Sequence, residues 1–262
     1  MTIAIDFSDV VRLEGPVRIA RGALDAAERA YAVTTWRRRM AGEYVSSRVF
    51  SALSTQALRA GLSHRVVEEL ARMAMEEVDH GRRCARVVAA FDEAPTADIP
   101  DLPPVPEHAD AEPLEAFFRN VLSVSCCSET AAVALVGAER EVASTEELRA
   151  QLDRILADEV GHARIGWKLL DEASLAEPMR ARLSAWLVTC FLHQLRFHGA
   201  SLAMPSVSEA SLSVGVPDGP RNFDLFFATM QSVTVPELER RGFQADRAFE
   251  VAMQIAEKEG RA

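Results

Sequence analysis

Several hallmarks of common protein classes are missing from this sequence. Basic residues are outnumbered, because 29 Lys and Arg stand against 39 Asp and Glu, and the formal net charge is −10. Affinity for phosphate backbones and anionic lipids depends largely on clustered Lys and Arg, so neither a nucleic acid nor a membrane is an expected partner. The N-terminal segment MTIAIDFSDVVRLEG lacks the basic start and apolar stretch of a signal peptide, and we expect no later segment to be apolar enough to span a bilayer. These absences predict a cytoplasmic protein.

Paired cysteines are also missing. The four cysteines form no CxxC motif, which argues against a zinc ribbon or a rubredoxin-type centre. A chain of 262 residues can bury a sizeable core without a disulfide framework, so we expect four reduced thiols. No repeat of solenoid period and no low-complexity tract interrupts the chain, and a single domain over residues 1–262 is the expected organisation.

Helical periodicity, in contrast, runs through most of the chain. Segments rich in Ala, Leu, Arg, Glu and Met predict four long amphipathic helices, at residues 22–60, 64–92, 113–142 and 146–172. A second set of elements is expected to follow: a fifth helix at 178–202, a loop at about 204–220, and helices near 221–241 and 244–260. The predicted fold class is therefore all-α, with a bundle core at about 22–172 and a C-terminal helical extension, 173–262, packed on it.

The connections between the helices predict how they are arranged. Ser63 and the Ser144-Thr145 pair are candidate N-caps, and Gly61 is a candidate C-terminal stop. The short connections beside them predict two antiparallel helical hairpins. Prolines in the stretch 93–113 forbid a continuous helix and favour one long extended crossover between the two hairpins.

Each of the four long helices carries an acid on its apolar stripe. In the first helix Glu43 interrupts the stripe that includes Met40 and Phe50, and the third helix likewise has one inward acid. In the second and fourth helices a Glu and a His lie three residues apart on the buried face. The order Glu, ExxH, Glu, ExxH gives six candidate metal ligands, which are also the candidate catalytic residues: Glu43, Glu77, His80, Glu129, Glu159 and His162.

The chemistry of this set favours iron. Four buried carboxylates without counter-charge would be costly to desolvate, whereas two divalent ions bring four positive charges. Each His supplies one neutral nitrogen and leaves room for oxygen at the metal. Zinc more often takes a tetrahedral site with fewer acids, and magnesium or calcium does not call for two imidazoles. A Mn/Fe pair would accept the same ligands. The alternative interpretation, two ordinary helix-face pairs, does not explain why both pairs lie on apolar stripes.

Four pieces of sequence carry this pattern: Glu43, EEVDH at 76–80, Glu129 and DEVGH at 158–162. Together they resemble the ligand pattern of the ferritin-like non-haem di-iron carboxylate superfamily, over about residues 22–172. The resemblance implies a ferritin-like four-helix bundle with one long crossover, two bound Fe ions, and O2 as co-substrate.

The resemblance also suggests how the histidines are oriented. Asp158 stands where the Asp of the family's DExRH motif accepts a hydrogen bond from a metal-bound His. The sequence departs from that motif at Gly161, and the second helix has Glu76 and Asp79 instead. The alternative is that Asp158, Glu76 and Asp79 are solvated helix charges.

Other residues near the pattern have two interpretations each. Small residues would leave space for a substrate or only allow close packing: Gly81, Ser125, Cys126, Gly161 and Gly166. Trp36 would line an access route or belong to the core. The run Arg37 to Arg39 is most simply a solvated face, with a dock for an acidic reductase as the alternative. His193 and His198 have no acid at ligand spacing and are not expected to be ligands.

The resemblance implies an oxidoreductase, namely a di-iron oxidase or oxygenase of a small organic substrate, with residues 173–262 helping to build the substrate pocket. The alternative is iron binding, ferroxidase activity or peroxide scavenging, as in ferritins and rubrerythrins, although rubrerythrins carry CxxC pairs. The acidic charge disfavours hydroxylation of a tRNA base, and Ile155 stands where arylamine N-oxygenases have an additional His. An external electron donor and a homodimer are both compatible with this prediction.

Overall fold

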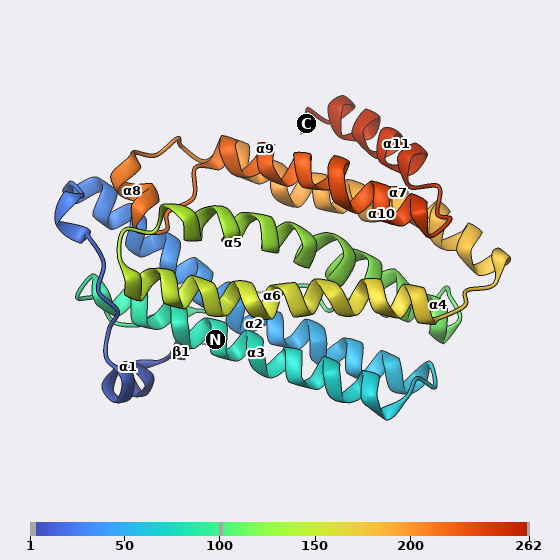
Figure 1. The fold of residues 1–262 in the computed structure, drawn as a ribbon, viewed down its shortest axis with the longest axis horizontal. Coiled ribbons are helices and arrows are strands. Elements are labelled where there is room, and N and C mark those ends of the chain that lie inside the picture. Colours follow the sequence, from blue (N-terminus) through green and yellow to red (C-terminus); the bar gives the residue numbers. More distant parts are fainter. Residues whose placement is uncertain (1–3, 100–101, 261–262) are drawn as a thin grey trace.

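The computed structural model describes residues 4–99 and 102–260, and most of them are helical (Figure 1). The long uninterrupted helices are α2 (Ala26–Arg59), α3 (His64–Ala90), α6 (Glu146–Glu172) and α7 (Glu177–Gly199). Two further helices contain a π-helical segment: α4 (Pro113–Val121), η2 (Leu122–Glu129) and α5 (Thr130–Val142) form one, and α9 (Gly219–Thr229), η4 (Met230–Thr234) and α10 (Val235–Arg240) form the other. The shorter elements are β1 (Ala4–Asp6), α1 (Ser8–Glu14), η1 (Arg21–Ala23), β2 (Thr96–Asp98), η3 (Ala200–Ala203), α8 (Glu209–Ser213) and α11 (Ala245–Lys258). The predicted all-α fold is confirmed.

Two helical hairpins form the core of the molecule. α2 packs against α3 along most of its length, and the continuous helix α4–η2–α5 packs against α6. α2 also contacts α4, and α3 contacts α6, so the two hairpins face each other across a shared interior. In Figure 1 the long helices run roughly along one direction, with α2 and α3 below α6 and α5. This arrangement brings all four apolar stripes to one place.

A long connector joins the two hairpins. The described part of residues 91–112 runs along α2, where the carbonyl oxygens of Pro103 and Pro106 accept hydrogen bonds from Arg48 Nη1 at 2.7 Å and Gln56 Nε2 at 3.0 Å. The connector also contains β2, which pairs with β1 in a two-stranded antiparallel sheet. The sequence predicted the extended connector but not this strand pairing.

The helix ends show which local signals the chain uses. Asp25 and Glu28 form a capping box, in which each side chain accepts a hydrogen bond from the other residue's backbone N–H, so α2 begins later than predicted. Thr145 caps α6 through its side chain, and Gly61 follows α2 with a φ of +69°, which favours glycine. Ser63 occupies the predicted N-cap position of α3 but its side chain makes no capping hydrogen bond.

The C-terminal helices cover one side of the second hairpin. α7 contacts η2, α9 contacts α5, and α11 packs on the outer side of α7. Figure 1 shows α7, α9 and α10 as a layer beside α5, with α11 outermost. The loop before α9 is tied to the first hairpin, because the buried Trp36 donates a hydrogen bond from Nε1 to the carbonyl of Val214 at 2.8 Å. Trp36 is thus a core residue, which is the second of its two interpretations.

The helix from Pro113 to Val142 is long and apolar enough to cross a membrane by length and composition. The expectation that no such segment exists is therefore wrong. The helix itself was predicted at these residues, but its apolar stretch was overlooked because charged residues stand near both ends and Glu129 stands in the middle. In the structure this helix contacts α2, α6, α7 and α9, which is how the central helix of a bundle packs.

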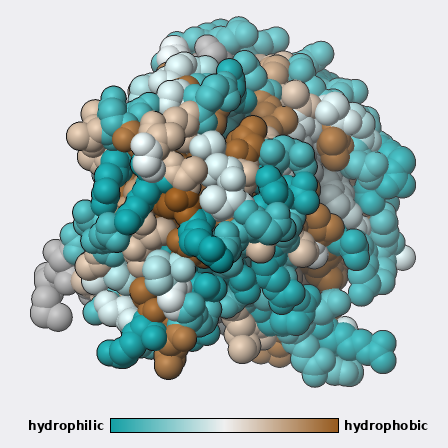
Figure 2. Space-filling view, turned by 60° about the vertical axis from the view of Figure 1, so that its left-hand side comes forward, coloured by the Kyte–Doolittle hydropathy of each residue, from teal (hydrophilic) through white to brown (hydrophobic). Residues whose placement is uncertain are grey.

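Polar residues predominate on one face of the molecule, and the thiols lie in its interior. Figure 2 shows one face on which hydrophilic residues predominate and hydrophobic residues gather in separate small patches. All four cysteines are free, as predicted, and buried, and the sulfur atoms of Cys127 and Cys190 lie 3.8 Å apart.

Candidate metal centre

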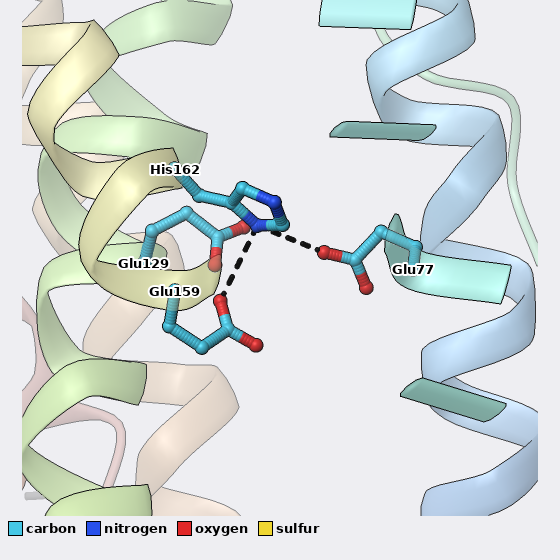
Figure 3. A group of neighbouring side chains, drawn as sticks. All are labelled: Glu77, Glu129, Glu159 and His162. Atoms are coloured by element: carbon cyan, nitrogen blue, oxygen red, sulfur yellow. Dashed lines mark ion pairs between the residues drawn. The ribbon is translucent and has the colours of Figure 1, made fainter. Parts of the chain in front are cut away.

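Two glutamates each reach two imidazole rings at the centre of the bundle. Glu77 places Oε1 at 3.2 Å from Nδ1 of His162 and Oε2 at 3.9 Å from Nδ1 of His80. Glu159 does the same, with Oε2 at 3.5 Å from Nδ1 of His162 and Oε1 at 3.5 Å from Nδ1 of His80. In Figure 3 Glu77 points from its own helix across the interior toward Glu159 and His162. Both carboxylates therefore span two neighbouring positions, as bridging ligands do.

One further glutamate completes each of these positions. Glu43 places Oε2 at 3.7 Å from Nδ1 of His80, and donor atoms of Glu43, Glu77 and His80 all lie within 4.8 Å of one another. Glu129 joins the other group, in which donor atoms of the four residues drawn in Figure 3 also lie within 4.8 Å of one another. The structure thus brings together all six residues that the sequence singled out.

The far side of each imidazole contacts a carboxylate from the opposite hairpin. Nε2 of His80 lies 3.3 Å from Oδ2 of Asp158, and Nε2 of His162 lies 3.0 Å from Oε2 of Glu76. A ring N–H that donates to such a carboxylate leaves Nδ1 unprotonated and able to bind a metal. Asp158 therefore has the orienting position expected of it, and Glu76 has the matching one. Asp79 instead pairs with an arginine at the surface.

A repeated motif, which the sequence analysis missed, places these outer carboxylates. α3 and α6 both carry Arg, three residues, an acid, Glu, two residues, and His. In α3, Arg72 pairs with Glu76, and in α6, Nε of Arg154 lies 3.7 Å from Oδ2 of Asp158. Residues four apart meet on one helix face, so each arginine neutralises the carboxylate that orients the other helix's histidine. The motif could have been found by aligning the two ExxH helices with each other.

The centre concentrates negative charge in a buried place. Burial alone lowers the pKa of His80 and of His162, but the surrounding carboxylates outweigh it and raise these pKa values to about 9 and about 10. Burial and the neighbouring acids raise the pKa of Glu77 to about 7 and that of Glu129 well above its usual range. The carboxylates therefore repel one another in this buried place and attract positive charge to it.

Three buried ligand atoms without a hydrogen-bond partner show that the residues fit a metal. Among the described residues, Nδ1 of His80, Nδ1 of His162 and Oε2 of Glu159 are buried without a hydrogen-bond partner. Buried polar atoms are rarely left without one, and all three point to the same interior where the carboxylates gather. The side chains of both histidines are fully buried, so water does not satisfy these atoms from outside. The arrangement can hold metal ions, with Nδ1 and carboxylate oxygens as donors.

The π-helical segment η2 ends at Glu129 and sets its position. A π-helix widens the turn, and the hydroxyl of Ser128 accordingly bonds to the carbonyl of Ser123, five residues earlier, at 3.1 Å. Gln194 of α7 donates a second hydrogen bond to that carbonyl at 3.0 Å. On the other side, α6 approaches η2 closely at Gly166. The helical periodicity of the sequence did not reveal this irregularity.

Arg39 does not lie on a solvated face. Its side chain is 17% exposed and donates to Glu43 at 3.2 Å and to Glu139 of α5. Burial alone lowers the pKa of Arg39, but Glu139 and Glu43 outweigh it and raise it further above its usual range, so the guanidinium keeps its charge. The four-residue spacing of Arg39 and Glu43 could have predicted their ion pair from the sequence. The ion pair with Glu139, which is far away in the sequence, could not have been predicted in this way.

A cavity of about 400 Å³ reaches the centre from one side. Its lining includes four of the six candidate ligands, Glu43, Glu77, Glu129 and Glu159. Other lining residues come from α5, from the end of α7 and from the start of α9. Ser125 and Cys126, which the sequence placed near the centre, are not among the lining residues. They are buried core residues, which agrees with their packing interpretation. The centre is therefore accessible to a small molecule, and the C-terminal extension forms part of the route.

Comparisons with protein-family models, with curated proteins and with solved structures find no match to this chain.

Proposed function

We propose that this protein is a carboxylate-bridged di-iron oxidase or oxygenase, related in fold to the ferritin-like superfamily, that uses O2 to oxidise a small organic molecule. One observation carries the proposal. Glu77 and Glu159 each place one carboxylate oxygen beside Nδ1 of His80 and the other oxygen beside Nδ1 of His162. Two metal positions that share two carboxylates and have one imidazole each are the arrangement that a di-iron pair requires.

The donor set supports iron over other ions. Four glutamates match the four positive charges of two divalent ions, and the two imidazoles suit iron, while calcium and magnesium prefer oxygen donors only. A zinc site usually has four donors and fewer acids than this one. When bound as a pair with open coordination positions, iron would supply the reduction of O2. Manganese in one position is compatible with the same donors, so metal analysis has to include it.

The protein's own residues prepare the site. Asp158 and Glu76 hold the two imidazole rings with Nδ1 toward the centre, which favours the tautomer that can bind a metal there. Glu77 and Glu159 would hold both metal ions as shared ligands. Arg39 holds Glu43 by a charge-assisted hydrogen bond, which keeps this carboxylate from swinging into the cavity.

The cavity supports an organic substrate. Its volume of about 400 Å³ lies in the range of small-molecule sites, and it opens onto four of the candidate ligands. Insertion of one oxygen atom of O2 into a C–H bond also requires two electrons and two protons, and the other oxygen atom leaves as water. An external electron donor is therefore part of this proposal, as it was of the sequence-based prediction.

Anaerobic loading with Fe(II) tests the proposal. We expect two metal ions per chain, measured by elemental analysis, and a transient change in the optical and Mössbauer spectra when O2 is admitted. Glu77→Ala and His162→Ala should lose both, whereas Glu68→Ala, an exposed residue of the same helix as Glu77, should retain both. Growth of a mineral core from added iron would favour the iron-handling alternative. Failure of the folded wild-type protein to bind iron or manganese stoichiometrically would refute the proposal.

A further inference from the structure

The lining of the cavity includes two polar side chains that make no hydrogen bond within the described part of the protein. His198, at the end of α7, and Asn222, near the start of α9, both line the cavity. Among the described residues, neither the ring nitrogens of His198 nor the side-chain amide of Asn222 has a hydrogen-bond partner. Partly buried polar groups that face a cavity without partners are typical of a ligand site.

The ring of His198 is held in a fixed position. It stacks on Phe226 with a centroid distance of 3.9 Å and an interplanar angle of 13°, and Phe197 packs against it edge-on at 5.1 Å. Burial, together with the charge of His193, lowers the pKa of His198 to about 4, so the imidazole is neutral at neutral pH. A neutral imidazole has one donor and one acceptor nitrogen and adds no charge to the cavity.

The other charges in the cavity balance. Two divalent ions would neutralise the four candidate glutamate ligands that line it. The remaining charged residues are Arg39 and Glu139, which pair with each other. A charged molecule entering this cavity would lose its hydration without meeting an unpaired counter-charge, which costs free energy. An uncharged molecule avoids that cost.

The cavity also has apolar lining. Ala132, Leu135 and Val136 line it on α5, between Glu129 near the metal positions and Glu139. Residues 129 to 139 of a helix cover roughly 15 Å along its axis, so the apolar lining extends from the candidate ligand Glu129 along α5. A molecule that has both an apolar body and a polar group matches this surface.

We infer that the site takes a small uncharged substrate, with an apolar body and a hydroxyl, carbonyl or amide group, and that His198 and Asn222 bind that polar group. The inference rests on the proposed function for the identity of the metal centre, and it adds the substrate class and two substrate-binding residues. It also gives the C-terminal extension a specific role, since both residues belong to it. The balanced charges disfavour anionic and cationic molecules of the same size.

The test uses benzyl alcohol as the neutral probe, with benzamide and cyclohexanol as further neutral probes and benzoate and benzylammonium as charged analogues. Binding to the anaerobic Fe(II)-loaded protein is measured by ligand-observed NMR, in which faster relaxation of the probe's protons reports their approach to iron. We expect the neutral probes to bind about tenfold more tightly than the charged ones. His198→Ala and Asn222→Ala should each weaken binding of benzyl alcohol by about fivefold while iron content stays at the wild-type level.

Controls separate this inference from the proposed function. His64→Ala changes an exposed histidine at the start of α3 and should leave probe binding unchanged. His198→Gln, which keeps donor and acceptor groups, should restore part of the affinity. If the protein holds no iron, the proposed function fails, and saturation-transfer NMR still measures binding to the cavity. Equal binding of benzoate and benzyl alcohol, absence of binding by all three neutral probes, or unchanged affinity in both alanine variants would overturn the inference.

Discussion

Replacement of Gly166 by alanine is the perturbation whose effect the structure defines most sharply. Gly166 lies on α6 where this helix packs against the π-helical segment, and an added Cβ would stand 2.6 Å from Cβ of Ser125 and 3.0 Å from Sγ of Cys126. Neither neighbour is the free end of a flexible chain. α6 and η2 must therefore move apart, and η2 ends at the candidate ligand Glu129.

The magnitude follows from two opposing effects. Overpacking of a tight interior contact costs about 1–3 kcal/mol, whereas alanine in place of glycine within a helix gains about 0.5–1 kcal/mol. We expect Gly166→Ala to lower the free energy of unfolding by about 1–2 kcal/mol as the net result. Gly161→Ala is the matched control on the same helix, because no atom lies within 4 Å of its added Cβ. Gly161→Ala should raise the free energy of unfolding by about 0.5–1 kcal/mol.

Urea unfolding of the two metal-free variants, followed by circular dichroism, measures both values. Chelator competition then measures the affinity for Fe(II), which should fall in Gly166→Ala, because Glu129 is displaced, and stay unchanged in Gly161→Ala. Wild-type stability in Gly166→Ala, or a loss of stability in Gly161→Ala as large as in Gly166→Ala, would refute the account of close packing at η2.

Three further predictions concern side chains away from the cavity. Asp158→Asn should weaken Fe(II) affinity about 10- to 100-fold in chelator competition with little effect on folding, and an unchanged affinity would contradict its orienting role. Burial alone raises the pKa of Glu115, but the guanidinium groups of Arg182 and Arg119 outweigh it and hold this pKa below 4.5. The stabilising contribution of the ionised carboxylate is therefore present above pH 4.5 and is lost as the pH falls through the folded-state pKa. Glu115→Gln should lower the free energy of unfolding by about 2 kcal/mol at pH 7, which is less than for a fully buried pair because Arg182 is half exposed. In urea titrations below pH 4.5 the difference in stability from wild type should shrink, and a constant difference would contradict this role. Trp36→Phe should cost about 1–2 kcal/mol in the same assay, because the buried carbonyl of Val214 loses its donor, and a smaller loss would show that water replaces the indole.

The convergence of the ligands was predictable because it depends on helical periodicity alone. Glu77 and His80 lie three residues apart, so a regular helix turns both to the same side, and the same holds for Glu159 and His162. Apolar neighbours on those faces then determine that the side is the buried one. The capping residue Thr145 was likewise readable, since a cap is a contact between residues close in the sequence.

The features that escaped prediction depend on contacts between distant segments. The π-helical segment is stabilised partly by Gln194, 71 residues after the carbonyl it bonds, and a local pattern of small polar residues does not specify it. Arg39 is drawn inward by Glu139, 100 residues away. His198 carried no ligand spacing, and only the packing of α7 and α9 beside α5 places it in the cavity. Local periodicity therefore defines the centre, whereas its surroundings require the tertiary structure.

Anomalous X-ray scattering at the iron edge, from crystals of the Fe(II)-loaded protein, tests the central claim most directly. The account predicts two anomalous peaks per chain, one beside Nδ1 of His80 and one beside Nδ1 of His162, with oxygen atoms of Glu77 and Glu159 contacting both. A single peak, peaks elsewhere on the protein, or density in which these two carboxylates do not bridge the metal positions would contradict it.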